Sequence, residues 1–216
     1  MNTLDYLVNK YNLEIVSNKP GVPQEIANVG RLDLIRWLRE LDFKIGLEIG
    51  VEAGRYARQI CELNSQMKLW GIDPYERYKE YEEYKSQEEM DRIYEVMLKE
   101  LEAPIKHDRF EIIKKRSQDA VKDFEDESLD FIYIDGNHEF DYPLKDMIDW
   151  WPKVKKGGML AGHDYVRAKN REFTIKDNLK QFTRENSINP WFVLGNYAKQ
   201  KGVVRDNTRS WVITKQ

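Results

Sequence analysis

The chain has 216 residues, and its 35 Lys and Arg against 38 Asp and Glu give a formal net charge of −3. This length suits one decorated α/β domain better than two independent ones. The near balance of charge excludes a nucleic-acid coat and a polybasic membrane anchor as descriptions of the whole chain. Its longest apolar runs have four residues, whereas a membrane-spanning helix needs roughly 20.

The cellular setting is indicated by the first residues and by the cysteine count. Residues 1–16 lack the basic start and the apolar core of a secretory signal. The one cysteine, Cys61, has no partner for an intrachain disulfide, which favours a reducing compartment. We therefore expect a cytoplasmic protein with no membrane contact.

Short apolar runs alternate with segments of helical spacing along the chain. The runs predict seven strands, at residues 45–49, 68–72, 110–114, 129–134, 158–161, 191–194 and 210–214. The helical segments between them predict a Rossmann-like, doubly wound α/β fold whose mostly parallel sheet is covered on both faces. Residues 195–209 have no helical pattern, so we expect the last two strands to form an antiparallel hairpin at one sheet edge.

Two segments extend this core, and we expect all of residues 1–216 to form a single domain. Residues 1–41 are predicted to be an amino-terminal helical extension, and residues 74–103 a helical insertion after the second strand. Apolar residues of the insertion share one helix face, which packs either on its own domain or on a second copy of the chain. These residues are Met90, Ile93, Met97 and Leu101.

The front of the insertion has a tyrosine at every third position. Such residues either pack beneath a charged helix or form an aromatic lid over a substrate. The residues are Tyr75, Tyr78, Tyr81 and Tyr84.

The segment GLEIGVEAGRYARQI is the strongest local signal for a ligand site. Glu48 ends a strand, Gly50 and Gly54 bracket a tight turn, and a helix follows. Glycines allow a ligand to approach the backbone, and the helix start exposes free N–H groups. An acid beside the turn would repel a pyrophosphate but suits a cation such as an α-ammonium or a sulfonium, unless Glu48 is a plain loop carboxylate. Asp73 ends the second strand, where an acid can accept hydrogen bonds from ribose hydroxyls.

The run E-I-G-x-x-x-G followed by I-D-P resembles class I S-adenosylmethionine-dependent methyltransferases. A later run, I-D-G-x-H, then G-G, then H-D-Y, resembles their small-molecule O-methyltransferases, and the likeness spans about residues 30–166. The resemblance implies that Asp135 contacts the cofactor near its transferable methyl group and takes part in the chemistry. It also implies that Ser117 and Gln118 lie against the adenine. The implied cofactor residues are therefore Glu48, Gly50, Gly54, Asp73, Ser117, Gln118 and Asp135.

The same resemblance implies a divalent metal ion beside the acceptor hydroxyl, held by Asp135, His163 and Asp164. His163 stands where such enzymes have an acid, which leaves Mg²⁺, Mn²⁺, Fe²⁺ and Zn²⁺ all open. Asp135 and His138 are the candidate general bases. A metal-free alternative is that the two acids are hydrogen-bonded loop residues and that His138 caps a helix.

The alternatives to methyl transfer are a metal-dependent hydroxylase or hydrolase on the same fold, since two Asp and two His can support non-haem iron, and a non-catalytic cofactor-binding subunit. The resemblance favours O-methylation of a small sugar-like or secondary-metabolite acceptor. Residues 165–216 have eleven bases and four acids, so an anionic acceptor can bind there, unless these bases only form a solvated surface. The bases nearest the expected site are Arg167, Lys169 and Arg171. No RNA-binding motif or zinc-finger spacing is present in the sequence, which argues against nucleic acid.

Overall fold

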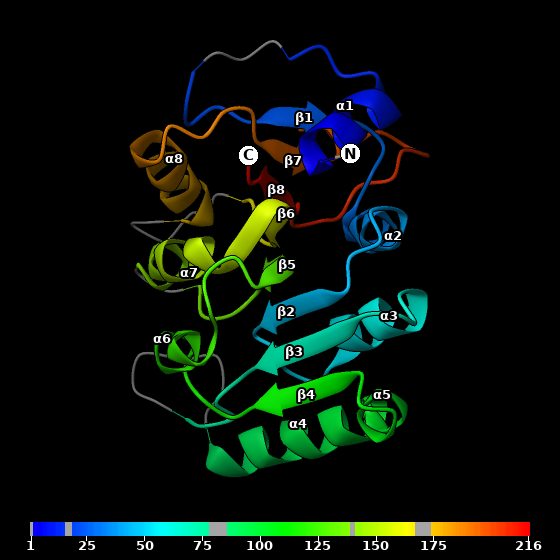
Figure 1. Cartoon of the computed structure of the whole chain (residues 1–216), viewed down its shortest axis with the longest axis vertical. Coiled ribbons are helices and arrows are strands. Elements are labelled where there is room, and N and C mark those ends of the chain that lie inside the picture. Colours follow the sequence, from blue (N-terminus) through cyan, green and yellow to red (C-terminus); the bar gives the residue numbers. More distant parts are fainter. Residues whose placement is uncertain (1, 16–18, 78–85, 139–140, 167–173) are drawn as a thin grey trace.

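The computed structural model describes residues 2–15, 19–77, 86–138, 141–166 and 174–216 (Figure 1). Within these ranges one sheet has eight strands in the order β1-β7-β8-β6-β5-β2-β3-β4. Neighbouring strands run parallel, except that β8 is antiparallel to both β6 and β7. The strands are β1 (Gln24–Ile26), β2 (Ile45–Ile49), β3 (Lys68–Ile72), β4 (Phe110–Ile113), β5 (Leu129–Ile134), β6 (Val154–Gly162), β7 (Phe192–Leu194) and β8 (Trp211–Thr214).

The α/β class and the seven predicted strands are confirmed, but the number of strands is wrong by one. The additional strand, β1, lies in residues 1–41, a segment predicted to be helical. It has three residues, of which only Ile26 is buried, so it lacks the apolar pattern of a strand. It pairs with β7 in parallel register, and its Glu25 forms an ion pair with Arg209 at 2.8 Å. The antiparallel β7–β8 pair is confirmed, yet β1 and not this pair forms the sheet edge.

Helices cover both faces of the sheet, as Figure 1 shows. Helices α6, α7 and α8 lie on one side, and α2 and α3 lie on the other. The helices are α1 (Thr3–Tyr11), α2 (Arg31–Glu40), α3 (Arg55–Leu63), α4 (Gln87–Glu100), α5 (Glu102–Lys106), α6 (Ser117–Ala120), α7 (Tyr142–Trp150) and α8 (Ile175–Glu185).

Alternation along the central strands divides the core into two clusters. In β5, Phe131 and Tyr133 pack with residues of α2 and α3, whereas Ile132 and Ile134 pack with residues of α7 and α8. Because successive strand residues point to opposite faces, and Glu48 of β2 is in register with Tyr133, Glu48 lies on the α2–α3 side. The strand pattern therefore places an acid beneath these two helices.

The apolar face of the insertion packs on its own domain. Met90, Met97 and Leu101 are buried, and Ile93 packs against the α2–α3 cluster. Of the tyrosines at the front of the insertion, Tyr75 is buried and its hydroxyl donates to the Glu52 carbonyl at 2.7 Å. Tyr78, Tyr81 and Tyr84 lie outside the described residues.

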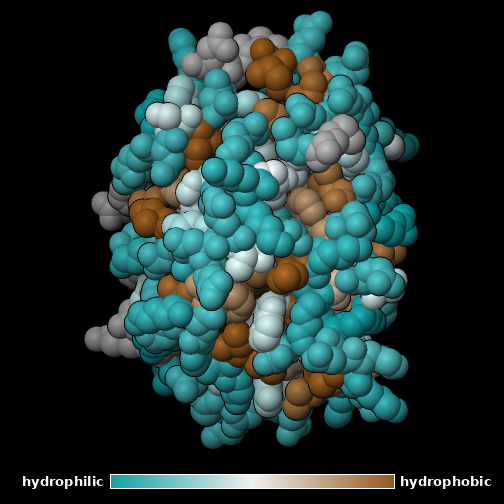
Figure 2. Space-filling view, in the orientation of Figure 1, coloured by the Kyte–Doolittle hydropathy of each residue, from teal (hydrophilic) through white to brown (hydrophobic). Residues whose placement is uncertain are grey.

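The outer surface is mainly polar. Hydrophilic residues dominate the face seen in Figure 2, and hydrophobic residues form small separate groups. Among the described residues, no helix combines the length and the hydropathy that crossing a membrane requires.

Candidate active site

Two adjacent strands, β2 and β5, mark the point where the chain changes direction across the sheet. From β2 the order continues through β3 to β4, whereas β5 leads the other way to β6. In such sheets ligands bind beyond the carboxyl ends of the strands at this switch point. Gly50 follows β2 and Asp135 follows β5, so the sequence motifs and the topology indicate the same place.

Gly50 forms the floor of this site. Its φ of +85° is a left-handed conformation, and a Cβ added there would lie 2.2 Å from the Asp135 carbonyl oxygen. No side chain fits in that space. The two strand ends are held by backbone bonds from Gly50 N to Ile72 O at 2.9 Å and from Asp135 N to Ile49 O at 2.8 Å.

The second glycine of the turn, Gly54, has a different neighbour. Its φ is +76°, and a Cβ added there would meet Leu101 at 2.8 Å and Met97 at 3.0 Å. Gly54 therefore allows α3 to approach the segment after α4. It lines neither of the two cavities described below.

An apolar cavity opens on one side of Gly50. Its walls include Ile72, Asp73 and Ile93 near the insertion, and Ser117, Gln118 and Asp146 on the opposite side. The Asp73 carboxylate accepts the backbone N–H of Glu52 and that of Tyr75, both at 3.0 Å. Burial raises the pKa of Asp73, and these hydrogen bonds act in the opposite direction. Asp73 is therefore oriented by the backbone.

Ser117 and Asp146 form a polar contact at the far end of the apolar cavity. The Trp150 indole N–H donates to the Ser117 hydroxyl oxygen at 2.7 Å, and Ser117 in turn hydrogen-bonds to the Asp146 carboxyl group. Burial raises the pKa of Asp146 to about 7. Asp146 was not predicted from the sequence, although it lies on the buried face of α7 with Pro143 and Met147. An acid on an otherwise apolar helix face was the available signal.

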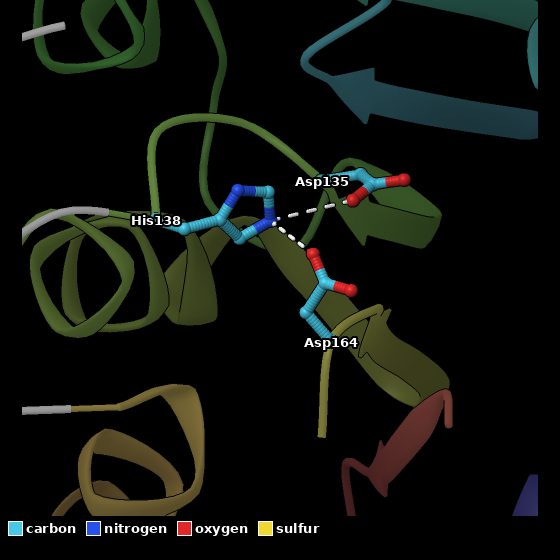
Figure 3. Close-up of side chains that lie close together, drawn as sticks. All are labelled: Asp135, His138 and Asp164. Atoms are coloured by element: carbon cyan, nitrogen blue, oxygen red, sulfur yellow. Dashed lines mark ion pairs between the residues drawn. The ribbon is translucent and has the colours of Figure 1, made fainter. Parts of the chain in front are cut away.

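Asp135 belongs to a cluster of three side chains, with His138 and Asp164 (Figure 3). His138, from the loop after β5, points between Asp135 and Asp164. Its Nε2 is 2.9 Å from Asp164 Oδ2 and 3.4 Å from Asp135 Oδ1. Burial lowers the pKa of His138, but its hydrogen bonds to the two acids outweigh burial and raise the pKa to about 9. Burial raises the pKa of Asp164, and the contact with His138 reverses this and lowers it to about 2.

The cluster fits the donor set of a divalent metal ion. One ligand atom from each of Asp135, His138 and Asp164 lies within 4.8 Å of the other two, and no other such group occurs in the described part of the chain. The set predicted from the sequence had His163 in place of His138. His163 lies at the margin, with Nδ1 3.4 Å from Asp164 Oδ1 and 3.8 Å from Asp135 Oδ1.

A polar cavity opens on the other side of Gly50. It is lined by Arg31, Glu48, Arg55, Tyr56, His138 and Asp164. It shares Gly50, Glu52, Asp135 and Gly136 with the apolar cavity. The two cavities therefore lie side by side at the ends of β2 and β5.

Glu48 is the most deeply buried acid of the polar cavity, with 2% of its surface exposed. Burial, and then the nearby Asp135, raise its pKa well above the ordinary value. Its Oε2 has no hydrogen-bond partner among the described residues. A buried carboxyl oxygen without a donor is costly, so this side of the cavity is suited to a ligand that carries N–H groups.

The structure thus brings together most of the predicted site residues. Glu48, His138 and Asp164 line the polar cavity; Asp73, Ser117 and Gln118 line the apolar one. Arg31 and Tyr56 of the polar cavity were not selected from the sequence. The bases expected to hold an anionic acceptor, Arg167, Lys169 and Arg171, lie outside the described residues.

Comparison with known proteins shows the family of the chain and proteins that share its fold. A family model described as a methyltransferase domain matches residues 47–165. None of the curated proteins matches the chain. Solved structures with low sequence identity share its fold.

A Staphylococcus aureus protein described as a caffeoyl-CoA O-methyltransferase has a TM-score of 0.57 at 17% identity, covering 98% of this chain and 90% of that one. An O-methyltransferase from Bacillus cereus, in complex with SAH, has a TM-score of 0.59 at 12% identity, with 98% and 89% coverage. TomG from Streptomyces achromogenes, an O-methyltransferase in complex with SAM, has a TM-score of 0.58 at 14% identity, with 100% and 97% coverage.

Proposed function

Because the chain belongs to the methyltransferase domain family, we propose that it transfers the methyl group of S-adenosylmethionine to a hydroxyl group of a small molecule. The observation that carries this proposal is the pair of neighbouring cavities at the switch point, one apolar and one polar. The SAM- and SAH-bound structures of similar fold support the choice of cofactor.

The adenosine part of the cofactor is assigned to the apolar cavity. Asp73 there accepts the ribose hydroxyls, while Ser117 and Gln118 lie against the adenine. The amino-acid part then passes Gly50 and enters the polar cavity, where Glu48 receives the α-ammonium group. This orientation directs the methyl group towards Asp135.

The reacting hydroxyl is assigned to the neighbourhood of Asp135 and His138. The acceptor oxygen attacks the methyl carbon in line with the carbon–sulfur bond, which breaks and leaves its electron pair on sulfur. The hydroxyl proton passes to the Asp135 carboxylate, while His138, whose raised pKa keeps it protonated near neutral pH, lies 3.4 Å from that carboxylate. Holding the two reactants in this geometry supplies much of the rate enhancement.

A divalent metal ion is the proposed additional component of the site. Asp135, His138 and Asp164 would hold it, with His163 as an adjacent fourth residue. Two carboxylates with imidazole suit Mn²⁺, Fe²⁺ or Zn²⁺ as well as Mg²⁺. When bound, such an ion lowers the pKa of a coordinated hydroxyl group.

Further proposals concern the domain organisation, the cellular location and the acceptor. We propose that residues 1–216 act as one domain, since one sheet takes strands from both ends of this range. Cys61 is a buried free thiol, and burial raises its pKa to about 12, which fits a cytoplasmic protein with an unreactive thiol. The family resemblance and the basic carboxyl-terminal segment favour a sugar-like or anionic acceptor. We also propose that the chain forms a homo-oligomer.

Calorimetric titration of S-adenosylmethionine and S-adenosylhomocysteine tests this function, with and without EDTA. We expect micromolar binding that falls by about 10- to 100-fold in Asp73→Ala, because ribose hydrogen bonds to a charged group are lost. Asp123→Ala, an exposed acid paired with Lys115, is the matched control. Absence of binding in folded wild-type protein would contradict the proposal and favour the metal-dependent hydroxylase or hydrolase.

A further inference from the structure

Arg31 is the first residue of α2, and its side chain lines the polar cavity together with Glu48 and Tyr56. The guanidinium carbon lies 5.4 Å from the centroid of the Tyr56 ring, a distance at which cation and ring attract. In the described part of the chain, no carboxylate lies within ion-pair distance of this guanidinium group. Arg31 is therefore a partly buried cation held by an aromatic ring.

The backbone around Arg31 is fixed by the carboxyl-terminal part of the chain. Asp206 Oδ2 accepts the backbone N–H of Arg31 at 2.7 Å, and Asp33 Oδ2 accepts that of Gly30 at 2.9 Å. Two of the free N–H groups at the start of α2 are thus already used within the protein. Because the backbone N–H of Arg31 is used in this way, Arg31 can donate to a ligand only through its guanidinium group.

The contact between Asp206 and the start of α2 requires a glycine at position 30. A Cβ added to Gly30 would lie 2.7 Å from Asp206 Oδ1, so a side chain there would displace Asp206. The direction in which Arg31 enters the cavity consequently depends on Gly30 and Asp206 together.

The polar cavity thus presents a cation and an anion to one ligand. Arg31 and Glu48 both line it, and Glu48 has a carboxyl oxygen without a donor. An α-amino acid group has the complementary pair of charges, an ammonium and a carboxylate. A guanidinium group binds a carboxylate through two parallel hydrogen bonds.

We propose that Arg31 binds the α-carboxylate of the methionine part of S-adenosylmethionine, opposite Glu48, which receives the α-ammonium. This inference rests on the proposed function. Arg55, the other arginine of the cavity, is exposed at the start of α3 and is therefore assigned to the solvent rim. Although burial lowers the pKa of Arg31, the nearby Tyr133 and Asp135 raise it, so the guanidinium keeps its charge.

The test compares two ligands by calorimetry: S-adenosylhomocysteine and its decarboxylated analogue, which lacks only the α-carboxylate. We expect wild-type protein to bind the decarboxylated ligand about 10- to 100-fold more weakly. Arg31→Gln should lose a similar factor for S-adenosylhomocysteine and should bind the two ligands with equal affinity. Arg31→Lys should recover part of the discrimination. Arg36→Gln, on the same helix and paired with Asp33 at the surface, should behave as wild type.

Three results would overturn the inference. Equal binding of both ligands by wild-type protein would do so without any substitution. Undiminished affinity and discrimination in Arg31→Gln would also do so. The third is an Arg31→Gln variant in which the KM for the acceptor rises while the affinity for S-adenosylhomocysteine does not change. That result would assign Arg31 to acceptor binding. Failure of wild-type protein to bind S-adenosylhomocysteine would instead contradict the proposed function itself.

Discussion

The two cavities that meet at Gly50 differ in whether their polar groups already have partners in the protein. In the apolar cavity, Asp73 accepts two backbone N–H groups and Ser117 accepts the indole N–H of Trp150. In the polar cavity, Glu48 has a carboxyl oxygen without a donor. The apolar cavity is therefore held in shape by its own hydrogen bonds, whereas Glu48 of the polar cavity needs a ligand to supply a donor.

The largest expected effect concerns Asp135, one of the four residues that line both cavities. Asp135→Asn removes the carboxylate beside the reacting hydroxyl, so we expect methyl transfer to slow by about 10²- to 10⁴-fold. Affinity for S-adenosylhomocysteine should change by less than about 10-fold, because most cofactor contacts lie elsewhere. The measurement is release of S-adenosylhomocysteine with a reactive acceptor. Asp126→Asn, a surface acid paired with Lys153, serves as the control, and full turnover in Asp135→Asn would refute the assigned role.

An intermediate effect is expected in the apolar cavity, as a dependence of stability on pH. The pKa of Asp146 is raised from 3.8 to about 7, so the folded state binds a proton more tightly than the unfolded state. This contribution is fully present below about pH 4 and is lost as the pH rises to about 7. Since Asn does not ionise, Asp146→Asn should gain on the order of 3 kcal/mol relative to wild type between pH 4 and 8.

Urea unfolding of both proteins at several pH values measures this gain. Asp141→Asn changes an exposed acid at the start of the same helix, paired with Lys145 and not lining the cavity, and should follow the wild-type curve. If the Asp146→Asn and wild-type stabilities stay parallel across this range, Asp146 does not titrate as described.

The smallest expected effect is a change in the stability of the protein when Glu48 of the polar cavity is replaced. Glu48→Gln keeps the shape of the side chain but removes a buried acid, so the ligand-free protein should be more stable by roughly 0.5–2 kcal/mol. The same change should weaken binding of S-adenosylhomocysteine, because the α-ammonium loses its charged partner. Thermal unfolding with and without this ligand measures both effects. Destabilisation of the ligand-free variant would show that Glu48 contributes to folding and not to ligand binding.

The sequence predicted the fold well because buried strands and amphipathic helices follow local periodicity. The strand β1 was missed for the opposite reason, since a three-residue strand with one buried side chain has no period to detect. Its position depends on β7, which is more than 160 residues away in the chain.

The sequence predicted those site residues that lie at the carboxyl ends of strands. Asp73, Asp135 and Asp164 each come directly after or near the end of a parallel strand, and such ends meet at one edge of the sheet. Asp146 was visible in principle as an acid on the buried face of α7. Arg31 was not, because its place in the cavity depends on how α2 packs beside Tyr56 of α3, which no local sequence pattern encodes.

The position of β8 between β6 and β7 has a consequence for synthesis of the protein. As the chain leaves the ribosome from its amino end, β2 and β5 emerge well before Asp206 and β8. A nascent chain can pair its central strands early, but the start of α2 receives its Asp206 contact only after the late strand segment has been made. The start of α2, and with it Arg31, is therefore fixed in place only after the central strands of the sheet have emerged.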